Sequence, residues 1–340
     1  MVGTDGGVMR GMSLKLETRP YAFALTRPLQ TYAGAWQQRR GWLLRIDDGC
    51  GGCGWGEVSP LTAQQQVHCH RWLTERIDGT AAFASVEEVE QLLEGSPAEV
   101  AFALGAALAE LQGLVGERSP LDWLPAPPSA CLLPAGAAMP EALARLLAVI
   151  PADGALTLKW KVAAAADPEE RRLLAWLLKA LPSQARLRLD ANGGWGLATA
   201  QRWAEDLEGE PRLEWMEQPL ALDDLAGHQH LLARLPVALD EGLRDHPDWR
   251  ACWPGWQVRR PALEGDPRPL LRQLQQGAPH LMLSTAFETG IGARWLAHLA
   301  ALQQRGPTPA APGLAPGWCP EDALFSPDPQ QVWTAAGEKP

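Results

Sequence analysis

Lysine is scarce in this sequence in comparison with arginine. Of its 30 basic residues only five are lysines, Lys15, Lys159, Lys161, Lys179 and Lys339, and the other 25 are arginines. Arginine stays protonated in proteins, so it supplies positive charge but no base, whereas lysine can lose its proton. A lysine that persists in such a chain is therefore a candidate for a position that needs an amine.

The sequence also lacks a surplus of positive charge and a long hydrophobic run. Its 30 basic and 40 acidic residues give a formal charge of −10, which leaves no chain-wide basic footprint for nucleic acid or anionic lipid. No stretch approaches the roughly 18 apolar residues needed to cross a bilayer. Residues 1–12 are glycine-rich and lack the apolar segment of a secretion signal. We therefore expect a cytoplasmic protein with neither nucleic acid nor a membrane as its partner.

What the sequence does contain is enough chain for two units. Its 340 residues, 46% hydrophobic and 21% charged, are typical of about two globular domains, or of one barrel with an attachment. We predict a flexible tail over residues 1–12. Residues 13–62 alternate and turn like an antiparallel sheet, residues 64–115 have helical patterns, and residues 120–128 are dense in proline. These features predict an α+β capping domain over residues 13–125.

Beyond the proline-dense segment the pattern changes to strand followed by helix, in steps of about 20–30 residues, as right-handed βαβ units require. Short β-like runs lie at residues 130–133, 156–162, 186–190, 212–216, 237–240, 256–260 and 280–284. We predict an α/β fold, a modified (β/α) TIM-type barrel over residues 126–320. Residues 321–340 are predicted to pack back toward the cap. An open doubly wound sheet is the alternative, although no glycine-rich phosphate turn follows the first run.

Charged and polar side chains recur where these predicted strands end. They are Lys159 and Lys161, Asp190 and Asn192, Glu217, Asp240 and Glu241, and Arg260. In a (β/α) barrel the carboxyl ends of the strands carry the chemistry. One functional group at each successive strand is hard to obtain from random surface charge, so we expect these side chains to meet in an active site.

Three of these residues are carboxylates from consecutive strands. Asp190, Glu217 and Asp240 together make a hard oxygen site that suits Mg²⁺, with Mn²⁺ as a substitute. Glu214 is an alternative third ligand, but the Glu-Gln-Pro sequence that begins at Glu217 favours Glu217. Asp240 and Glu241 also suit a helix start. The apolar run before Asp240 favours ligation at a strand end, with Glu241 in support.

The two central lysines share one face of their predicted strand, because side chains alternate across a strand. Lys159 and Lys161 then look into the barrel mouth, where like-charge repulsion lowers the pKa of each and prepares one as a neutral base. A metal opposite a lysine base removes a proton next to a carboxylate and stabilises the resulting enediolate. Asn192 is predicted to support the site. Arg188, which has the strand parity of Asp190, is predicted to help hold a substrate carboxylate.

In this ordered set of residues the sequence resembles the enolase superfamily, in the branch with a Lys-x-Lys motif and Asp, Glu and Asp metal ligands. Within that branch it is similar to the o-succinylbenzoate synthases. The closer features are Gly-Trp-Gly-Glu-Val-Ser-Pro-Leu at 54–61, Arg-Leu-Asp-Ala-Asn at 188–192 and Leu-Ser-Thr-Ala-Phe-Glu-Thr-Gly-Ile-Gly at 283–292. The resemblance covers most of the chain. Its strength lies in the ordered set of motifs rather than in any single one.

The resemblance implies a dehydration, in which 2-succinyl-6-hydroxy-2,4-cyclohexadiene-1-carboxylate loses water to give 2-succinylbenzoate in menaquinone or phylloquinone synthesis. It implies that Lys161 is the base and then the acid, that Lys159 tunes it electrostatically, and that Mg²⁺ holds the enediolate. The residues implied to border or contact the substrate are Glu57 in the cap and Ser284, Thr285 and Gly290 after the last predicted strand.

Arg260 departs from the family pattern, which usually has a third lysine just before the proline that follows the sixth strand. Arginine cannot be deprotonated, so Arg260 is neither an acid nor a base. A racemase or epimerase needs a proton-transfer group on each face of its substrate. A syn dehydration needs one lysine and an opposing cation, for instance in cation–π contact with the forming ring. Arg260 therefore favours the dehydratase. The alternatives are a racemase, epimerase or cycloisomerase on this scaffold, and a non-catalytic binding protein that retains the fold.

Overall fold

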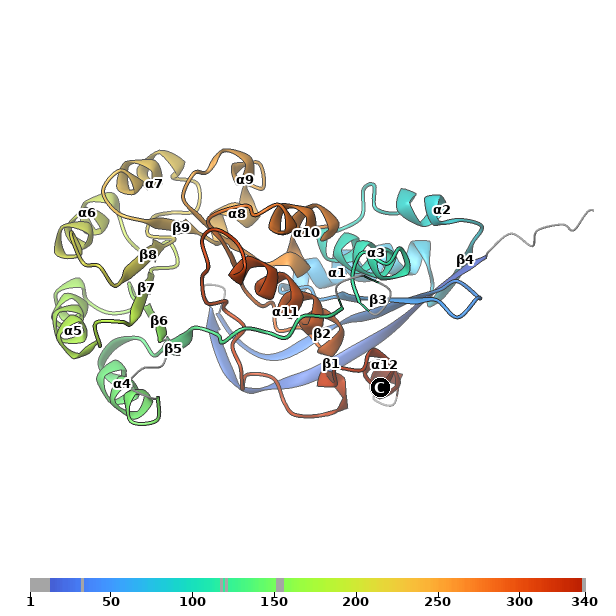
Figure 1. The fold of residues 1–340 in the computed structure, drawn as a ribbon, viewed down its shortest axis with the longest axis horizontal. Helices are drawn as coiled ribbons and strands as arrows, with labels where there is room; N and C mark the ends of the chain where they lie inside the picture. The colour runs from blue at the N-terminus through green and yellow to red at the C-terminus, as the bar shows by residue number, and fades with distance from the viewer. Residues whose placement is uncertain (1–12, 32–33, 117–118, 120–121, 151–155, 338–340) are drawn as a thin grey trace, which may run out of the picture.

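The computed structural model describes residues 13–31, 34–116, 119, 122–150 and 156–337. Two sheets organise this part of the chain (Figure 1), an antiparallel sheet of four strands followed by a parallel sheet of seven. The predicted α/β class, with a capping sheet and a TIM-type barrel, is confirmed. The predicted tail over residues 1–12 lies outside the described residues, and the predicted domain limits stay predictions. No helix in the described residues is long and apolar enough to span a membrane.

The capping sheet has the strand order β3-β2-β1-β4. Its strands are β1 (Leu14–Thr31), β2 (Gly34–Asp47), β3 (Cys53–Val58) and β4 (Thr80–Phe83). The interpretation of residues 64–115 as helices alone is wrong at β4, which pairs antiparallel with residues 14–17 of β1. None of the four residues of β4 is fully buried, so the run carries too little periodic signal to be told from a helix.

Three helices cover this sheet, α1 (Ala63–Arg76), α2 (Val86–Gln91) and α3 (Ala98–Leu111). Helix α1 begins at a capping box, in which Thr62 and Gln65 satisfy each other's backbone amides. Helix α3 packs against β3 so closely that a Cβ on Gly54 or Gly56 would lie 2.0 Å from a backbone oxygen of α3. The Gly-Trp-Gly motif therefore belongs to the packing of the cap.

The parallel sheet runs in sequence order from β5 to β11. Its strands are β5 (Cys131–Leu133), β6 (Thr157–Lys161), β7 (Arg186–Asp190), β8 (Leu213–Glu217), β9 (Val237–Leu239), β10 (Trp256–Arg259) and β11 (Leu281–Leu283). Each overlaps one of the predicted runs. Because all seven strands are parallel, their carboxyl ends lie at the same rim.

Helices cover the outer face of this sheet (Figure 1). They are α4 (Met139–Leu147), α5 (Asp167–Ala180), α6 (Leu197–Asp206), α7 (Leu225–Leu232), α8 (Glu241–Asp245), α9 (Trp249–Cys252), α10 (Arg268–Gln275) and α11 (Gly290–Gln304). Trp160 of β6 is fully buried, and its ring centroid lies 6.2 Å from that of Trp203 in α6. The alternation predicted for β6 therefore holds, with Trp160 outward and its two lysine neighbours toward the mouth.

An extended segment completes the barrel between its first and last strands. Gly313 N donates to Leu283 O at 2.8 Å, beside the end of β11, and Ala130 N donates to Pro312 O at 2.9 Å, just before β5. Both edges of the seven-stranded sheet are thereby bonded to the same short stretch of chain. The resulting ring of backbone joins the start of β5 to the carboxyl end of β11 and so closes the barrel.

The last helix, α12 (Pro329–Gly337), packs on the first strand, β1 (Figure 1). Arg19 Nη1 donates to Trp333 O at 3.1 Å, and the Arg19 guanidinium lies 4.5 Å from the centre of the Trp333 ring. Trp333 also belongs to an apolar cluster with Tyr21 and Phe23 of β1. The end of the chain thus covers one face of its beginning.

Candidate active site

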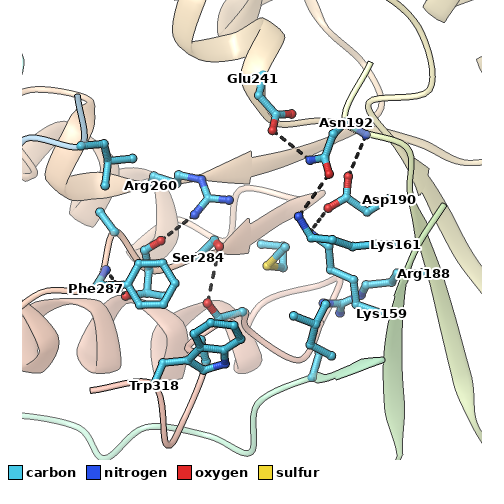
Figure 2. Close-up of a pocket in the computed structure, with 18 of the residues that line it drawn as sticks. Lys159, Lys161, Arg188, Asp190, Asn192, Glu241, Arg260, Ser284, Phe287 and Trp318 are labelled. Atoms are coloured by element: carbon cyan, nitrogen blue, oxygen red, sulfur yellow. Dashed lines mark hydrogen bonds and ion pairs between the residues drawn. The ribbon is translucent and has the colours of Figure 1, made fainter. Parts of the chain in front are cut away.

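A cavity of about 150 Å³ opens at the carboxyl ends of the barrel strands. Figure 2 shows side chains from several strands converging on it. The predicted site residues that line it are Lys159, Lys161, Arg188, Asp190, Asn192, Glu241, Arg260, Ser284 and Thr285. Glu217 and Asp240 lie behind this lining, in contact with its cations. The structure therefore brings together the set that the sequence placed at strand ends.

Strand register brings the acidic residues to one level. Asp190 of β7 pairs with Lys161 of β6 and with Glu217 of β8. Glu217 pairs in turn with Ala238, two residues before Asp240. The three acidic residues are at most 1% exposed. Burying three carboxylates together is costly unless positive charge compensates them.

Lys159 supplies this compensation on the β6 side. Its Nζ lies 2.9 Å from Asp190 Oδ2 and also bonds to Glu217 Oε1. Burial works to lower the pKa of Lys159, but the carboxylates of Asp190, Glu217 and Asp240 raise it well above its usual value. The expectation that the paired lysines lower each other's pKa is therefore wrong for Lys159, because three carboxylates outweigh one neighbouring ammonium.

Lys161 has a different partner. Its Nζ donates to Asn192 Oδ1 at 3.1 Å, and Asn192 Nδ2 donates to Glu241 Oε1 at 3.1 Å. Asn192 adopts φ +44°, in the left-handed region that asparagine tolerates better than most residues. Across the described part of the chain, Lys161 forms no ion pair. A neutral amide thus orients this amine without neutralising its charge.

Arg260 compensates the carboxylates on the β10 side. Its Nε lies 3.0 Å from Asp240 Oδ1 and its Nη2 bonds to Oδ2, while Nη1 donates to Thr285 O. Burial works to raise the pKa of Asp240, but Arg260, with Arg244 and Lys159, holds it well below its usual range. The forked guanidinium matches a carboxylate in this way, which a lysine does not.

Glu241 is an acidic residue of the cavity lining whose pKa is raised by burial. It is 5% exposed, and burial raises the pKa of Glu241 to about 7, with the charges of Asp240 and Asp190 adding to the effect and Arg244 and Arg260 opposing it. The supporting role predicted for Glu241 corresponds to its hydrogen bond from the Asn192 side chain.

Arg188 lies at the floor of the cavity and is fully buried. Its Nε donates to Glu214 Oε2 at 2.6 Å and its Nη1 to Ala311 O at 2.7 Å. Its guanidinium stacks 4.0 Å from the centre of the Trp215 ring. Arg188 Nη2 is buried with no hydrogen-bond partner among the described residues. Glu214 is therefore the partner of Arg188, whereas Glu217 joins the carboxylate cluster.

Glu57 and Gly290 are not part of the cavity lining, so the interpretation that they border or contact the substrate needs correction. Glu57 is fully buried and accepts hydrogen bonds from Tyr21 Oη, from the backbone and hydroxyl of Thr289, and from Gly292 N. A Cβ on Gly290 would lie 2.1 Å from Ser326 O. Both residues fix the N-terminus of α11, Glu57 by joining it to the cap and Gly290 by close packing.

Sequence reasoning missed the apolar part of the lining. Leu61 comes from the cap, Met282 from β11, Phe287 from the loop after it, and Trp318 from the loop that follows α11. Phe287 lies inside the motif at 283–292, but an apolar residue in a motif is as readily explained by the core as by a ligand-binding surface. A positive φ of 61° distinguishes Phe287, and backbone angles are not readable from a composition.

The donor set suits a divalent metal ion. Asp190, Glu217 and Asp240 offer only oxygen, as Mg²⁺ requires, and all three act electrostatically on the single Nζ of Lys159. Among the described residues no three acidic, cysteine or histidine side chains already surround one ion-sized point. Instead, they bond to Lys159 and Arg260. An ion bound by these carboxylates would share them with the two cations.

Comparisons with known proteins agree with the family resemblance of the sequence motifs. A family model described as "Enolase C-terminal domain-like" matches residues 141–253. The o-succinylbenzoate synthase of Thermosynechococcus vestitus is 32% identical over 298 residues, which are 84% of this chain and 88% of that protein. The o-succinylbenzoate synthase of Edwardsiella ictaluri is 29% identical over 80% of this chain and 82% of that protein.

The fold of this protein also matches the folds of solved structures. The crystal structure of o-succinylbenzoate synthase from Thermosynechococcus elongatus BP-1, complexed with Mg in the active site, superposes with a TM-score of 0.76 at 29% identity. It covers 94% of this chain and 99% of that one. The L-Ala-D/L-Glu epimerase of Bacillus subtilis, at 21% identity and a TM-score of 0.68, covers 91% of each chain and shares the fold.

Proposed function

Because the chain belongs to the o-succinylbenzoate synthase family of the enolase superfamily and is a hydro-lyase of menaquinone biosynthesis, we propose that Lys161 is its catalytic base. The supporting observation is the contrast between Lys161 and two other cations of the cavity lining. Lys159 and Arg260 are held by carboxylates, whereas Lys161 is held by the neutral amide oxygen of Asn192. An amine without a carboxylate partner can give up its proton without breaking an ion pair.

The reaction converts 2-succinyl-6-hydroxy-2,4-cyclohexadiene-1-carboxylate into 2-succinylbenzoate and water. Lys161 takes the proton from the carbon that bears the carboxylate, and the ring electrons then expel the hydroxyl group. The same proton returns from Lys161 to the departing hydroxyl, which leaves as water. One lysine on one face of the ring therefore completes a syn elimination and leaves an aromatic ring.

Asp190, Glu217 and Asp240 are the residues that would hold Mg²⁺. When bound, the ion supplies a positive charge that binds the substrate carboxylate and stabilises the negative charge left by proton removal. Lys159 bridges Asp190 and Glu217, so it fixes the positions of two of these ligands and adds positive charge near Lys161. This is the electrostatic role that we propose for Lys159.

Arg260 provides a permanent cation on the other side of the mouth. It can face the ring as aromaticity develops, because a guanidinium is attracted to the face of an aromatic ring. It transfers no proton, which supports an elimination over an epimerisation that needs a proton-transfer group on each face.

The second carboxylate of the substrate, on its succinyl chain, needs a partner of its own. We assign Arg188 to one of the two carboxylates, directly or through water, because it lines the cavity and its buried Nη2 has no hydrogen-bond partner among the described residues. Ser284 lines the same cavity, and its hydroxyl makes a long hydrogen bond to Gly313 O, at 3.4 Å, that a substrate carboxylate can replace. Thr285 is less free, since its hydroxyl donates to Glu288 and its carbonyl accepts from Arg260.

The direct test is conversion of the cyclohexadiene substrate by the purified chain with Mg²⁺, followed by the ultraviolet absorbance of 2-succinylbenzoate. We expect turnover that depends on Lys161. Release of the aromatic product at an unchanged rate by Lys161→Ala would remove this residue from the base position. For location, we propose the cytoplasm, in line with six unpaired cysteines, and a small carboxylate as the partner.

A further inference from the structure

One residue of the cavity lining holds a backbone conformation that side chains disfavour. Phe287 adopts φ +61°, in the left-handed region where any residue with a Cβ pays a steric cost. Its backbone N donates to Thr285 Oγ1 at 2.7 Å, and that hydroxyl donates to Glu288 at 2.6 Å. Ala286 N also donates to Glu288, at 2.9 Å. A buried network thus holds this turn in a conformation that its sequence does not favour.

The turn presents the Phe287 ring to the cavity, next to a second aromatic ring. Phe287 is 7% and Trp318 8% exposed, and both line the cavity. Their ring centroids lie 6.0 Å apart at an interplanar angle of 56°. Figure 2 shows both rings on the side of the cavity that holds Arg260, away from Lys161 and Asn192.

The cap secures Trp318 from the other direction. Thr26 of β1 donates through its backbone N to Trp318 O at 3.0 Å and through its hydroxyl to Gly317 O at 2.7 Å. The guanidinium of Arg27 lies 4.1 Å from the centre of the Trp318 ring. Two independent parts of the molecule, the strained turn of the barrel and the first strand of the cap, therefore place one aromatic surface.

We propose that Phe287 and Trp318 form an aromatic wall that selects ligands containing a flat six-membered ring, and so determine the specificity of the site. This inference rests on the proposed function, because it deepens the choice of substrate at the same cavity. A ring bound between Lys161 and the wall makes offset or edge contacts with two aromatic side chains. An acyclic dicarboxylate of equal charge retains the contacts to the cations and lacks those to the wall.

The test is calorimetric binding in the presence of Mg²⁺, with 2-succinylbenzoate and the acyclic heptanedioate as probes. Phe287→Leu and Trp318→Leu remove one aromatic ring each and keep the side chains apolar. We expect each to weaken 2-succinylbenzoate by roughly five- to tenfold, the size of an aromatic pair contact, and heptanedioate by less than about twofold. Trp176→Leu, at a partly exposed tryptophan of α5, is the matched control and should change neither.

A second pair of variants separates the ring of Phe287 from its backbone. Phe287→Gly removes the ring and relieves the positive φ, whereas Phe287→Ala removes the ring and retains the steric cost. We expect equal loss of 2-succinylbenzoate affinity in both, with the higher melting temperature for the glycine variant. Wild-type affinity in Phe287→Gly would show that the ring does not select the ligand, and would overturn the wall.

The outcomes distinguish this inference from the proposed function. Equal weakening of both probes, or no preference of the unmodified enzyme for 2-succinylbenzoate, overturns the wall even if the enzyme turns over its substrate. A ring preference that depends on Phe287 and Trp318, in an enzyme that releases no product from the cyclohexadiene, supports the wall and overturns the proposed reaction.

Discussion

The two sides of the barrel mouth solve one electrostatic problem with different cations. On the β6 side Lys159 bridges Asp190 and Glu217, and on the β10 side Arg260 grips Asp240 with a fork of two bonds. Both arrangements compensate buried carboxylates. Only the β6 side adds a second amine, Lys161, bound to a neutral amide. The comparison shows that positive charge alone does not identify the base. The partner of each cation decides how easily that cation can release a proton.

Removal of the metal acts on both sides at once and should have the largest effect. Because Asp190, Glu217 and Asp240 are oxygen ligands, we expect a chelator to abolish turnover and Mg²⁺ or Mn²⁺ to restore it. The measurement is product absorbance before and after metal is added back. Full activity in excess chelator would refute the assignment of the three carboxylates.

The charge-conserving variant Lys161→Arg tests the β6 side alone. It keeps a cation at the same position and removes the ability to exchange a proton. We expect kcat to fall by about 10³-fold or more, within the upper range of general acid–base catalysis. The initial rates at which the unmodified enzyme and the variant form 2-succinylbenzoate, at the same Mg²⁺ concentration, measure this loss.

The matched variant on the β10 side is Arg260→Lys, which preserves the charge and loses the fork. We expect it to remain within about tenfold of the unmodified kcat, whereas Arg260→Ala should lose about 100-fold, since it removes the cation that faces the forming ring. Near wild-type turnover in Lys161→Arg, together with collapse in Arg260→Lys, would reverse the assignment of base and bystander.

The variant Arg260→Ala should also lower the free energy of unfolding. Arg260→Ala leaves Asp240 buried without its guanidinium partner, and breaking a buried pair costs roughly 3–5 kcal/mol. We expect the loss to be greatest without metal and to shrink when Mg²⁺ is added, because the ion takes over the compensation. Chemical denaturation with and without Mg²⁺ measures this difference, and a loss independent of Mg²⁺ would separate Asp240 from the metal site.

A smaller effect than that of Arg260→Ala is expected from Asn192, the residue that links Lys161 to Glu241. Asn192→Gly keeps the left-handed backbone conformation, which glycine adopts readily, and removes the amide that holds Lys161 and Glu241. We expect kcat to fall by about tenfold, as for other supporting partners at catalytic sites, with little change in melting temperature. A kcat unchanged in this variant would show that Lys161 needs no orientation from Asn192.

Much of this site was predictable because its residues stand at the ends of regular elements. Lys161, Asp190 and Glu217 are the last residues of short strands, and strand register places them side by side. The electrostatic environment of each side chain was harder to predict from the sequence. The pKa of Lys159 depends on carboxylates from three other strands, and no local pattern indicates their distances.

Other features depended on contacts between distant parts of the chain. The sequence predicts that Glu57 borders the substrate, because Glu57 lies in a motif that resembles one of the family. Its actual partners at Thr289 and Gly292 lie more than 230 residues later. The strand β4 is too short and too exposed to carry a period. The positions of Phe287 and Trp318 depend on the positive φ of Phe287 and on hydrogen bonds from Thr26 of the cap to the loop that carries Trp318.

The packing of α12 on β1 has a consequence for how the protein is made. Arg19 and Trp333 are bonded to each other although they lie 314 residues apart. At synthesis rates of about 5–20 residues per second, roughly 15–60 s separate the emergence of the two partners from the ribosome. During that interval Tyr21 and Phe23 lack the apolar cover that Trp333 later provides. The packing of β1 is thus completed only after α12 has been synthesised.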